Sequence, residues 1–209
     1  MADFDPGTGL GPRLRLVRSS RQLSVRELAR RVGCSASLIS QIERGVSVPS
    51  VGVLYSLATE LGSSLDYLLF GSGAGPGLGE APSEISRVSG SAPPAIVQRG
   101  CDRRIIDLAS GVRWERLTPQ SEAMTDFLEV IYSPGGHSTD ERRPLRHDGR
   151  EYGLIISGTL QANVGFESYE LGPGDSIAFD SSTPHEYLNK TGEVVHAIWV
   201  VVHSEPGRA

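Results

Sequence analysis

Residues 71–94 divide this chain into two parts, and that division limits its fold more than any other feature. The segment reads GSGAGPGLGEAPSEISRVSGSAPP and consists mostly of Gly, Ser, Pro and Ala. Because it has few large apolar side chains, it cannot form a core of its own and is typical of an exposed linker. We therefore predict two domains, over residues 10–70 and 95–209, with a disordered tail at residues 1–9.

Residues 10–70 carry apolar residues at helical spacing, in runs that begin at a capping residue and end at glycine. The clearest run follows Ser24, ends at Gly33 and repeats its apolar positions at i, i+3, i+4 and i+7. Glu27 completes a capping box with Ser24, in which each side chain binds the backbone N–H of the other residue. Ser35 and Ser50 begin further runs. We predict helices over residues 12–20, 24–32, 35–44, 50–61 and 66–70.

Two of these helices have the form of a helix-turn-helix unit, in which a short glycine-containing turn joins them. The second helix of such a unit must be polar enough to enter the major groove of DNA. Residues 10–48 hold eight arginines against Glu27 and Glu43, so this acidic chain, of net charge −5, has one basic segment. A helical bundle with an ordinary polar surface is the alternative. In the DNA-binding interpretation, the contacting residues on helix 35–44 are Ser35, Ser37, Ser40, Gln41 and Arg44.

Residues 95–209 carry short apolar or alternating runs that are interrupted by Gly, Pro and Asp. Many short strands at close spacing favour an all-β sandwich or barrel. The whole chain is then an α+β multidomain protein, with an all-α bundle before an all-β domain. We predict strands over residues 127–132, 152–156, 159–164, 176–179 and 194–202.

Three side chains in the β-rich part have the chemistry of metal ligands. His147 and Glu151 are four residues apart and would face one side of an extended strand, and His185 follows in a later turn. Two imidazoles and a carboxylate can bind Zn, Ni, Mn or Fe(II) and leave coordination positions open. A surface ion pair and a turn hydrogen bond are the alternative interpretations of the same residues.

Residues 10–70 resemble, without a gap, the Xre-type helix-turn-helix domain of lambda-repressor-like proteins. The most specific pieces are LSVRELA, SLISQIERG and PSVGVLYSLATEL. The resemblance implies that residues 24–32 form the positioning helix and residues 35–44 the recognition helix. It also implies a structural ion pair between Glu43 and an arginine of the first helix, Arg18. At Val25 the family often has a glutamine that contacts phosphate. We expect either that Arg26 replaces this contact or that the affinity for a half-site is modest.

The β-rich part resembles the cupin fold, a double-stranded β-helix or jelly-roll barrel. One motif is His147, Glu151 and Gly158, and the other is LGPGDSIAFDSSTPHEYLN. The resemblance implies that His147, Glu151 and His185 bind a metal, but Leu145 stands where the family usually has a further histidine. Without a metal, the same three residues would hydrogen-bond an organic ligand directly.

Together the two resemblances imply a sequence-specific transcription regulator and not an enzyme. Its partners are a double-stranded DNA operator, a small effector in the barrel and a second copy of the chain. Arginines bind carboxylates and phosphonates well, so those around the first cupin motif favour an acidic effector: Arg142, Arg143, Arg146 and Arg150. One alternative is a non-haem iron oxygenase or epoxidase with a 2-His-1-carboxylate triad, similar in plan to hydroxypropylphosphonate epoxidase. Another is a regulator whose barrel only dimerises.

The composition also limits where the protein works. Two cysteines are too few for a disulfide framework, and no export signal or apolar run of membrane-spanning length is visible. We therefore expect a cytoplasmic protein with no membrane partner.

Overall fold

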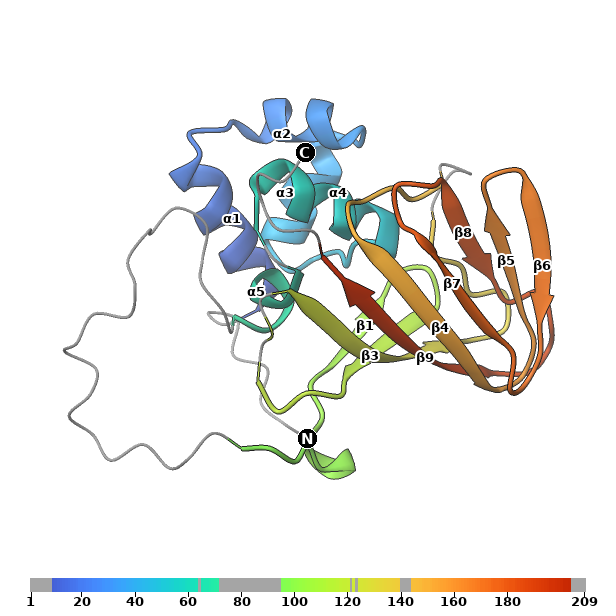
Figure 1. Ribbon diagram of the computed structural model, residues 1–209. Coiled ribbons are helices and arrows are strands. Elements are labelled where there is room, and N and C mark those ends of the chain that lie inside the picture. The colour runs from blue at the N-terminus through green and yellow to red at the C-terminus, as the bar shows by residue number, and fades with distance from the viewer. Residues whose placement is uncertain are drawn as a thin grey trace.

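The computed structural model describes residues 9–63, 65–71, 95–120, 122, 124–139 and 144–203. Within these ranges five α-helices form one part and nine β-strands form the other, and the helices lie against one side of the β part (Figure 1). This confirms the α+β multidomain prediction. Most of the predicted linker and tail, residues 72–94 and 1–8, falls outside the described residues.

The helices begin and end where the capping pattern predicts. Ser24, Ser35 and Ser50 each accept a hydrogen bond from the backbone N–H three residues later, at 3.1, 3.1 and 3.4 Å. Gly33 and Gly62 end their helices with φ of 76° and 53°, the left-handed conformation that glycine adopts without strain. None of the described helices is long and apolar enough to cross a membrane. The helices are α1 (Leu10–Ser20), α2 (Val25–Val32), α3 (Ala36–Glu43), α4 (Val51–Leu61) and α5 (Leu65–Phe70).

One half of the predicted capping box is wrong. The Glu27 carboxylate does not turn back to Ser24, but accepts hydrogen bonds from Arg30 at 2.8 and 3.0 Å and from Arg31 at 2.8 Å. Two guanidinium groups one helical turn away attract a carboxylate more strongly than a neutral backbone N–H does. They also hold the pKa of Glu27 at about 2.

The predicted ion pair between α1 and the end of α3 is confirmed. Arg18 donates from Nε to Glu43 Oε1 at 2.5 Å and from Nη2 to Oε2 at 3.0 Å. A third donor, Nη1, binds the carbonyl of Leu23 at 2.7 Å. Because both side chains of the pair are largely buried, this contact fixes α3 against the rest of the helical part.

The β part contains two antiparallel sheets. The larger has the order β1-β2-β3-β9-β4-β7 and the smaller the order β6-β5-β8. Along β9 the burial alternates, with every second residue from Val195 to Val201 facing the interior. The strands are β1 (Ile105–Leu108), β2 (Val112–Arg116), β3 (Thr125–Tyr132), β4 (Arg150–Ser157), β5 (Leu160–Val164), β6 (Glu167–Leu171), β7 (Ser176–Asp180), β8 (His185–Leu188) and β9 (Val195–Val202).

All five predicted strands are present, and β1, β2, β6 and β8 were not predicted. The strand β6 lies at the edge of the smaller sheet, and four of its five residues are exposed, so it has no apolar alternation to detect. The aromatic side chains of the β part do not all reach the core. Tyr152 lies on the outer face of β4, and Phe166 is fully exposed in the β5–β6 turn.

The helix α4 joins the two parts. One of its faces carries Leu54, Leu57 and Leu61, which are fully buried, while Gly52 and Tyr55 face the β part. The backbone N–H of Gly52 donates to the carbonyl of Ser138 at 3.1 Å. The helical domain is therefore docked on the barrel through α4, in addition to the covalent connection.

Candidate metal and effector site

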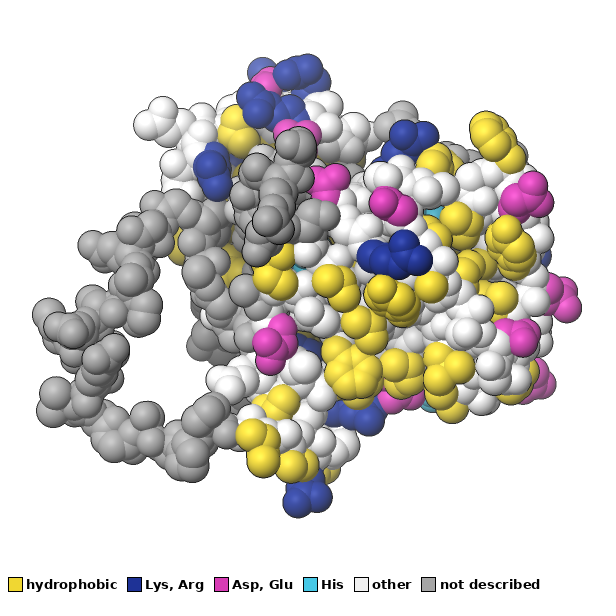
Figure 2. Space-filling model, viewed as in Figure 1, with side chains coloured by type: hydrophobic (Ala, Val, Ile, Leu, Met, Phe, Trp, Pro, Cys, Tyr) yellow, Lys and Arg dark blue, Asp and Glu magenta, His cyan; other side chains and the backbone are white. Residues whose placement is uncertain are grey.

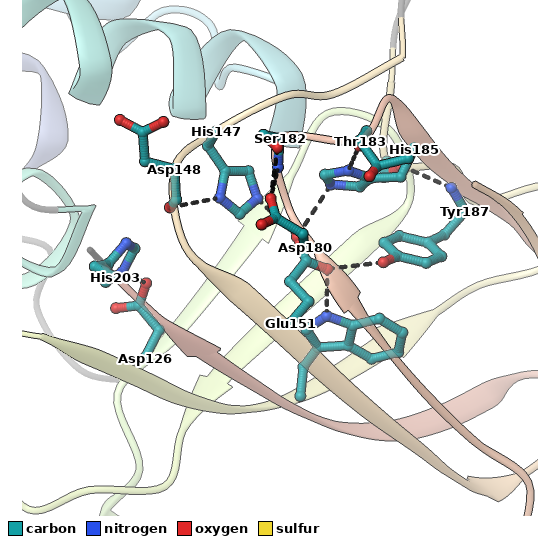
Figure 3. Close-up of polar contacts among 12 residues, drawn as sticks. Asp126, His147, Asp148, Glu151, Asp180, Ser182, Thr183, His185, Tyr187 and His203 are labelled. Atoms are coloured by element: carbon teal, nitrogen blue, oxygen red, sulfur yellow. Dashed lines mark hydrogen bonds and ion pairs between the residues drawn. The ribbon is translucent and has the colours of Figure 1, made fainter. Parts of the chain in front are cut away.

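The three predicted ligand residues come together in the interior of the barrel. Glu151 lies on β4 of the larger sheet, His185 begins β8 of the smaller sheet, and His147 precedes β4 (Figure 3). Their ligand atoms all lie within 4.8 Å of one another, and all three residues are buried. No other such group of His, Cys, Asp and Glu occurs among the described residues.

The argument that brought His147 and Glu151 to one face was wrong in detail. It assumed one extended strand, but β4 begins only at Arg150, and the chain turns at Gly149 with φ of 123°. A Cβ at this glycine would lie 2.3 Å from the carbonyl oxygen of Val202, so the turn requires glycine. The turn, and not strand geometry, directs His147 toward Glu151.

The two imidazoles face the carboxylate with atoms that have no hydrogen-bond partner. His147 Nε2 lies 2.7 Å and His185 Nε2 lies 3.0 Å from Glu151 Oε1. Both Nε2 atoms are nevertheless buried, and neither has a hydrogen-bond partner with suitable geometry. Nδ1 of His185 lies 2.8 Å from the carbonyl of Thr183, which assigns the proton to Nδ1 and leaves a lone pair on Nε2. A buried lone pair that faces a carboxylate oxygen is stable only with a cation or an additional proton between them, so these residues fit a metal ion.

The other carboxylate oxygen is held by two further side chains. Tyr187 donates its hydroxyl proton and Trp199 its indole N–H to Glu151 Oε2, each at 2.7 Å. Burial by itself would raise the pKa of the Glu151 carboxyl, but positive charge on the two imidazoles would hold that pKa well below its ordinary value. Glu151 is therefore an anion whose Oε1 is aimed at the two histidines, the orientation of a metal ligand supported by neighbouring hydrogen bonds.

Leu145 occupies the position at which the family usually has another histidine. Its backbone pairs with that of His185 through hydrogen bonds of 2.7 and 3.0 Å, and its side chain is buried. His137 lies elsewhere and is not a member of the ligand cluster. The described residues thus offer three protein ligands.

An aromatic side chain from the helical domain covers the site. The ring of Tyr55 on α4 stacks on His147 with centroids 4.2 Å apart and planes within 7°. The Tyr55 ring also packs edge to face with the ring of Trp114, with ring centroids 5.9 Å apart. Burial, together with the Glu151 carboxylate, raises the pKa of the Tyr55 hydroxyl well above its ordinary value, so this residue is neutral.

Two cavities are lined in part by Tyr55. The inner one, beside Glu151 and His185, has a volume of about 20 Å³, enough for one water molecule. The outer one lies between the domains, has a volume of about 460 Å³ and is within the usual size range of ligand pockets. Tyr55 and Leu145 are the two residues that line both.

The predicted arginine cluster does not converge on the barrel interior. Arg150 is exposed and lies over the ring of Tyr152, 5.7 Å from its centroid. Arg146 is also exposed and lines the outer, interdomain cavity. Arg142 and Arg143 lie outside the described residues.

The predicted DNA-contacting residues lie on and beside α3. Arg26, Ser35, Ser37 and Arg44 are exposed, and Ser40 and Gln41 are half-buried. Lys and Arg side chains gather at the end of the molecule where α2 lies (Figure 2). The hydroxyl oxygen of Ser35 already caps α3, so only its proton is left for a phosphate. Arg44 donates from Nε to the Ser40 carbonyl at 3.1 Å, which holds its guanidinium along the end of α3.

The sequence analysis missed two residues that shape the site, Tyr55 and Tyr187. For Tyr55 a signal exists, because α4 carries apolar residues on more than one face, a pattern typical of a helix buried on two sides. Tyr187 gives no comparable signal, since β8 was not recognised as a strand.

Comparisons with known proteins agree with this architecture. A helix-turn-helix domain family matches residues 11–73, and a cupin domain family matches residues 128–201. The HTH-type transcriptional regulator PuuR of Escherichia coli is 28% identical over 93% of this chain and 95% of its own length. SutR of the same organism, another HTH-type transcriptional regulator, is 26% identical over 90% of each chain.

A solved structure supports the fold over the full length. The crystal structure of an HTH_3 family transcriptional regulator from Vibrio cholerae covers 96% of this chain and 98% of its own, with a TM-score of 0.63 and 21% identity. Both domains, their order and their joint arrangement are thus found together in known regulators. The chain therefore combines an Xre-type helix-turn-helix domain with a C-terminal cupin domain, and over nearly its whole length it is similar to HTH-type transcriptional regulators.

Proposed function

We propose that this regulator reads a DNA operator with α3 and that a small molecule bound at the barrel changes its affinity for that operator. The observation that carries the proposal is the pairing of two features in one docked chain. One is an exposed polar helix fixed by the Arg18–Glu43 ion pair, and the other is a buried site whose imidazole Nε2 atoms lack partners. Because the partner would be a DNA operator, the proposal places the protein in the cytoplasm.

In the DNA complex, Gln41 and Arg44 would contact base edges or phosphates. Ser35, Ser37 and Ser40 would bind phosphates or bases, and Arg26 at the start of α2 would bind phosphate. Replacing Gln41 and Arg44 together with alanine should weaken binding to a selected operator by roughly 10- to 100-fold, since a good bidentate base contact contributes about 1–3 kcal/mol.

The operator would first be selected from random DNA with the wild-type protein, and affinities would then be measured by fluorescence anisotropy. The matched control is Arg150→Ala, which also removes an exposed arginine but on the barrel. Wild-type affinity in the Gln41/Arg44 double variant, with a normal circular dichroism spectrum, would show that α3 is not the recognition helix.

His147, Glu151 and His185 would hold a divalent metal through two nitrogen atoms and one oxygen, a donor set that suits Zn, Ni, Mn or Fe(II). When bound, the ion would supply open coordination positions for an acidic effector. Metal analysis of protein purified without chelator should find about one ion per chain in the wild type. The variants His147→Ala and His185→Ala should lose it.

His196→Ala is the control variant, because His196 pairs with Glu129 on the outer face at 2.9 Å. Equal metal content in all three variants would remove the metal from the proposal. Addition of Fe(II) without oxygen, followed by oxygen uptake, tests the oxygenase alternative. We infer a regulatory and not a catalytic role for the three ligand residues, because PuuR and SutR, which are similar to this chain over nine-tenths of its length, are transcriptional regulators.

We also infer that the effector is a small acid, because Arg146 presents a guanidinium to the interdomain cavity. A panel of carboxylates and phosphonates can be screened by the rise in melting temperature that each produces in the wild-type protein. The proposal expects at least one compound whose effect is lost in Arg146→Ala but kept in Arg150→Ala. Compounds that stabilise both variants equally would point to a neutral effector.

The outer face of the larger sheet is suited to a homodimer contact. Hydrophobic side chains cover β4 and its neighbours on this face (Figure 2), and Tyr152, Leu154 and Ile156 are 40–53% exposed. Contiguous apolar patches on soluble proteins mark interaction sites. A two-fold dimer would present two α3 helices to half-sites about 34 Å apart. Leu154→Glu should give a monomer in light scattering and weaker operator binding, whereas a monomeric wild type would refute the dimer.

A further inference from the structure

The contact between α4 and the barrel places one residue of the DNA-binding domain inside the effector site. Tyr55 belongs to the helical domain by sequence, yet its ring stacks on His147 and its neighbourhood includes Trp114 of β2. A parallel aromatic pair of this kind adds favourable contact beyond the apolar area it buries. The site is therefore closed by α4 and not by the barrel alone.

Leu145 completes the closure from the barrel side. An ideal Cβ on Gly52 of α4 would lie 3.1 Å from Leu145 Cδ2, so this leucine packs directly against the helix backbone. Together Tyr55 and Leu145 form the partition, the pair of side chains that separates the two cavities. The partition thus consists of one residue from each domain.

The size of the two cavities decides which way a ligand must enter. The inner cavity of about 20 Å³ holds one water molecule, whereas the outer cavity of about 460 Å³ holds a small organic molecule. A ligand that reaches the metal-binding residues from the outer cavity must move Tyr55 or Leu145. Tyr55 belongs to α4 and Leu145 packs against it. A ligand that moves either side chain therefore also changes the contacts of α4.

The outer cavity touches the recognition helix as well. Ser35 and Leu38, at the start of α3, line it opposite Leu145 and Arg146. The same helix is fixed at its other end by the Arg18–Glu43 pair. A ligand in this cavity is therefore in contact with α3 at its N-terminal end and with the barrel at once.

We propose that the interdomain cavity is the entry and binding site of the effector and that the Tyr55–Leu145 partition couples its occupancy to the position of α3. This rests on the proposed regulatory function. A ligand shifts an equilibrium only through contacts that differ between two states. The partition provides that difference, since a ligand that passes from the outer cavity to the metal-binding residues would have to displace Tyr55 or Leu145.

Carbethoxylation of the metal-free protein by diethylpyrocarbonate, read out by mass spectrometry, tests the partition without any effector. The reagent attacks unprotonated imidazoles. We expect His147 and His185 to react about tenfold faster or more in Tyr55→Ala and Leu145→Ala. In these variants the reagent can reach the imidazoles without a local opening of the structure. Tyr55→Phe keeps the stacked ring and should match the wild type. His196, whose side chain is 39% exposed, should react alike in every variant.

Equal reactivity of His147 and His185 in the wild type and in both alanine variants would overturn the partition. The second arm tests the coupling to DNA with Leu145→Trp, in which a larger ring occupies the partition permanently. Operator affinity should change about fivefold or more. The control Tyr169→Trp, on an exposed position of β6, should leave it unchanged.

An unchanged operator affinity in Leu145→Trp would overturn the coupling. If the wild-type protein bound no operator at all, the regulatory function would fail instead. The carbethoxylation result would still decide whether the partition closes the site, so the two failures are distinguishable.

Discussion

The ion pair between Arg18 and Glu43 should stabilise the helical domain far more than any exposed pair in the chain. Its two hydrogen bonds of 2.5 and 3.0 Å join side chains that are only 12% and 8% exposed. The exposed comparison is Arg113 with Asp107, which has the same bidentate form at 2.6 and 3.3 Å but side chains 47% and 69% exposed. Burial is thus the main difference between the pairs.

The expected loss follows from what each substitution leaves behind. Arg18→Met leaves a buried carboxylate without its partner, which costs about 3–5 kcal/mol, and it also removes the hydrogen bond to the Leu23 carbonyl. Arg113→Met should cost about 0.5 kcal/mol, since water replaces the lost partner. The double variant Arg18→Met/Glu43→Leu should recover more than about 1 kcal/mol of the loss, because no unpaired charge remains buried.

Urea unfolding followed by two probes measures these differences. Circular dichroism at 222 nm reports the helices, while tryptophan fluorescence reports the barrel, because Trp114 lies on β2 and Trp199 on β9. For Arg18→Met the helical transition should move more than the fluorescence transition. Its melting temperature should fall on the order of 12–40 °C, given a loss of about 3–5 kcal/mol and about 4–8 °C per kcal/mol for a domain of this size.

An equal, small loss in Arg18→Met and Arg113→Met would refute the reasoning, because burial would then contribute nothing to the difference. A double variant that is less stable than Arg18→Met would refute the second step. It would mean that the carboxylate finds another partner when the guanidinium is removed.

Three further predictions concern the barrel. Gly153→Ala places a Cβ 2.4 Å from two ring carbons of Trp199, so it should cost about 1–3 kcal/mol in urea unfolding and change the near-ultraviolet circular dichroism; an unchanged spectrum and midpoint would contradict it. Burial lowers the pKa of His203, but its hydrogen bond to Asp126 outweighs that effect and leaves the pKa raised. The stability it contributes is therefore complete below the ordinary histidine pKa of about 6.5 and is lost as the pH rises through the raised value. The difference in melting temperature between wild type and His203→Gln should shrink from about pH 5.5 to pH 9, and a constant difference would count against this linkage. Chelator should lower the melting temperature of the wild type by several degrees, because a metal that binds only the folded state stabilises it, and should not affect His185→Ala; an equal drop in both would place the metal elsewhere.

The amino-acid sequence was sufficient to predict most helix boundaries and to name the three residues that meet inside the barrel. Capping serines and terminal glycines mark α2, α3 and α4 because they satisfy backbone groups within a few residues, which makes the signal local. The spacing of the cupin motif likewise identified His147, Glu151 and His185. Exposed edge strands such as β6 could not be predicted. Their formation depends on pairing with a neighbouring strand, which local sequence preference does not specify.

Only the tertiary structure decided how these parts act on one another. No sequence pattern states that Glu151 Oε2 is held by Tyr187 and Trp199, because the three residues lie on different strands and meet only when the two sheets close. The same holds for Tyr55, which the sequence assigns to the DNA-binding domain and the fold places on a ligand histidine of the barrel. Contacts between distant segments depend on packing and not on local propensity, so the contact between the two domains is a property of the tertiary structure.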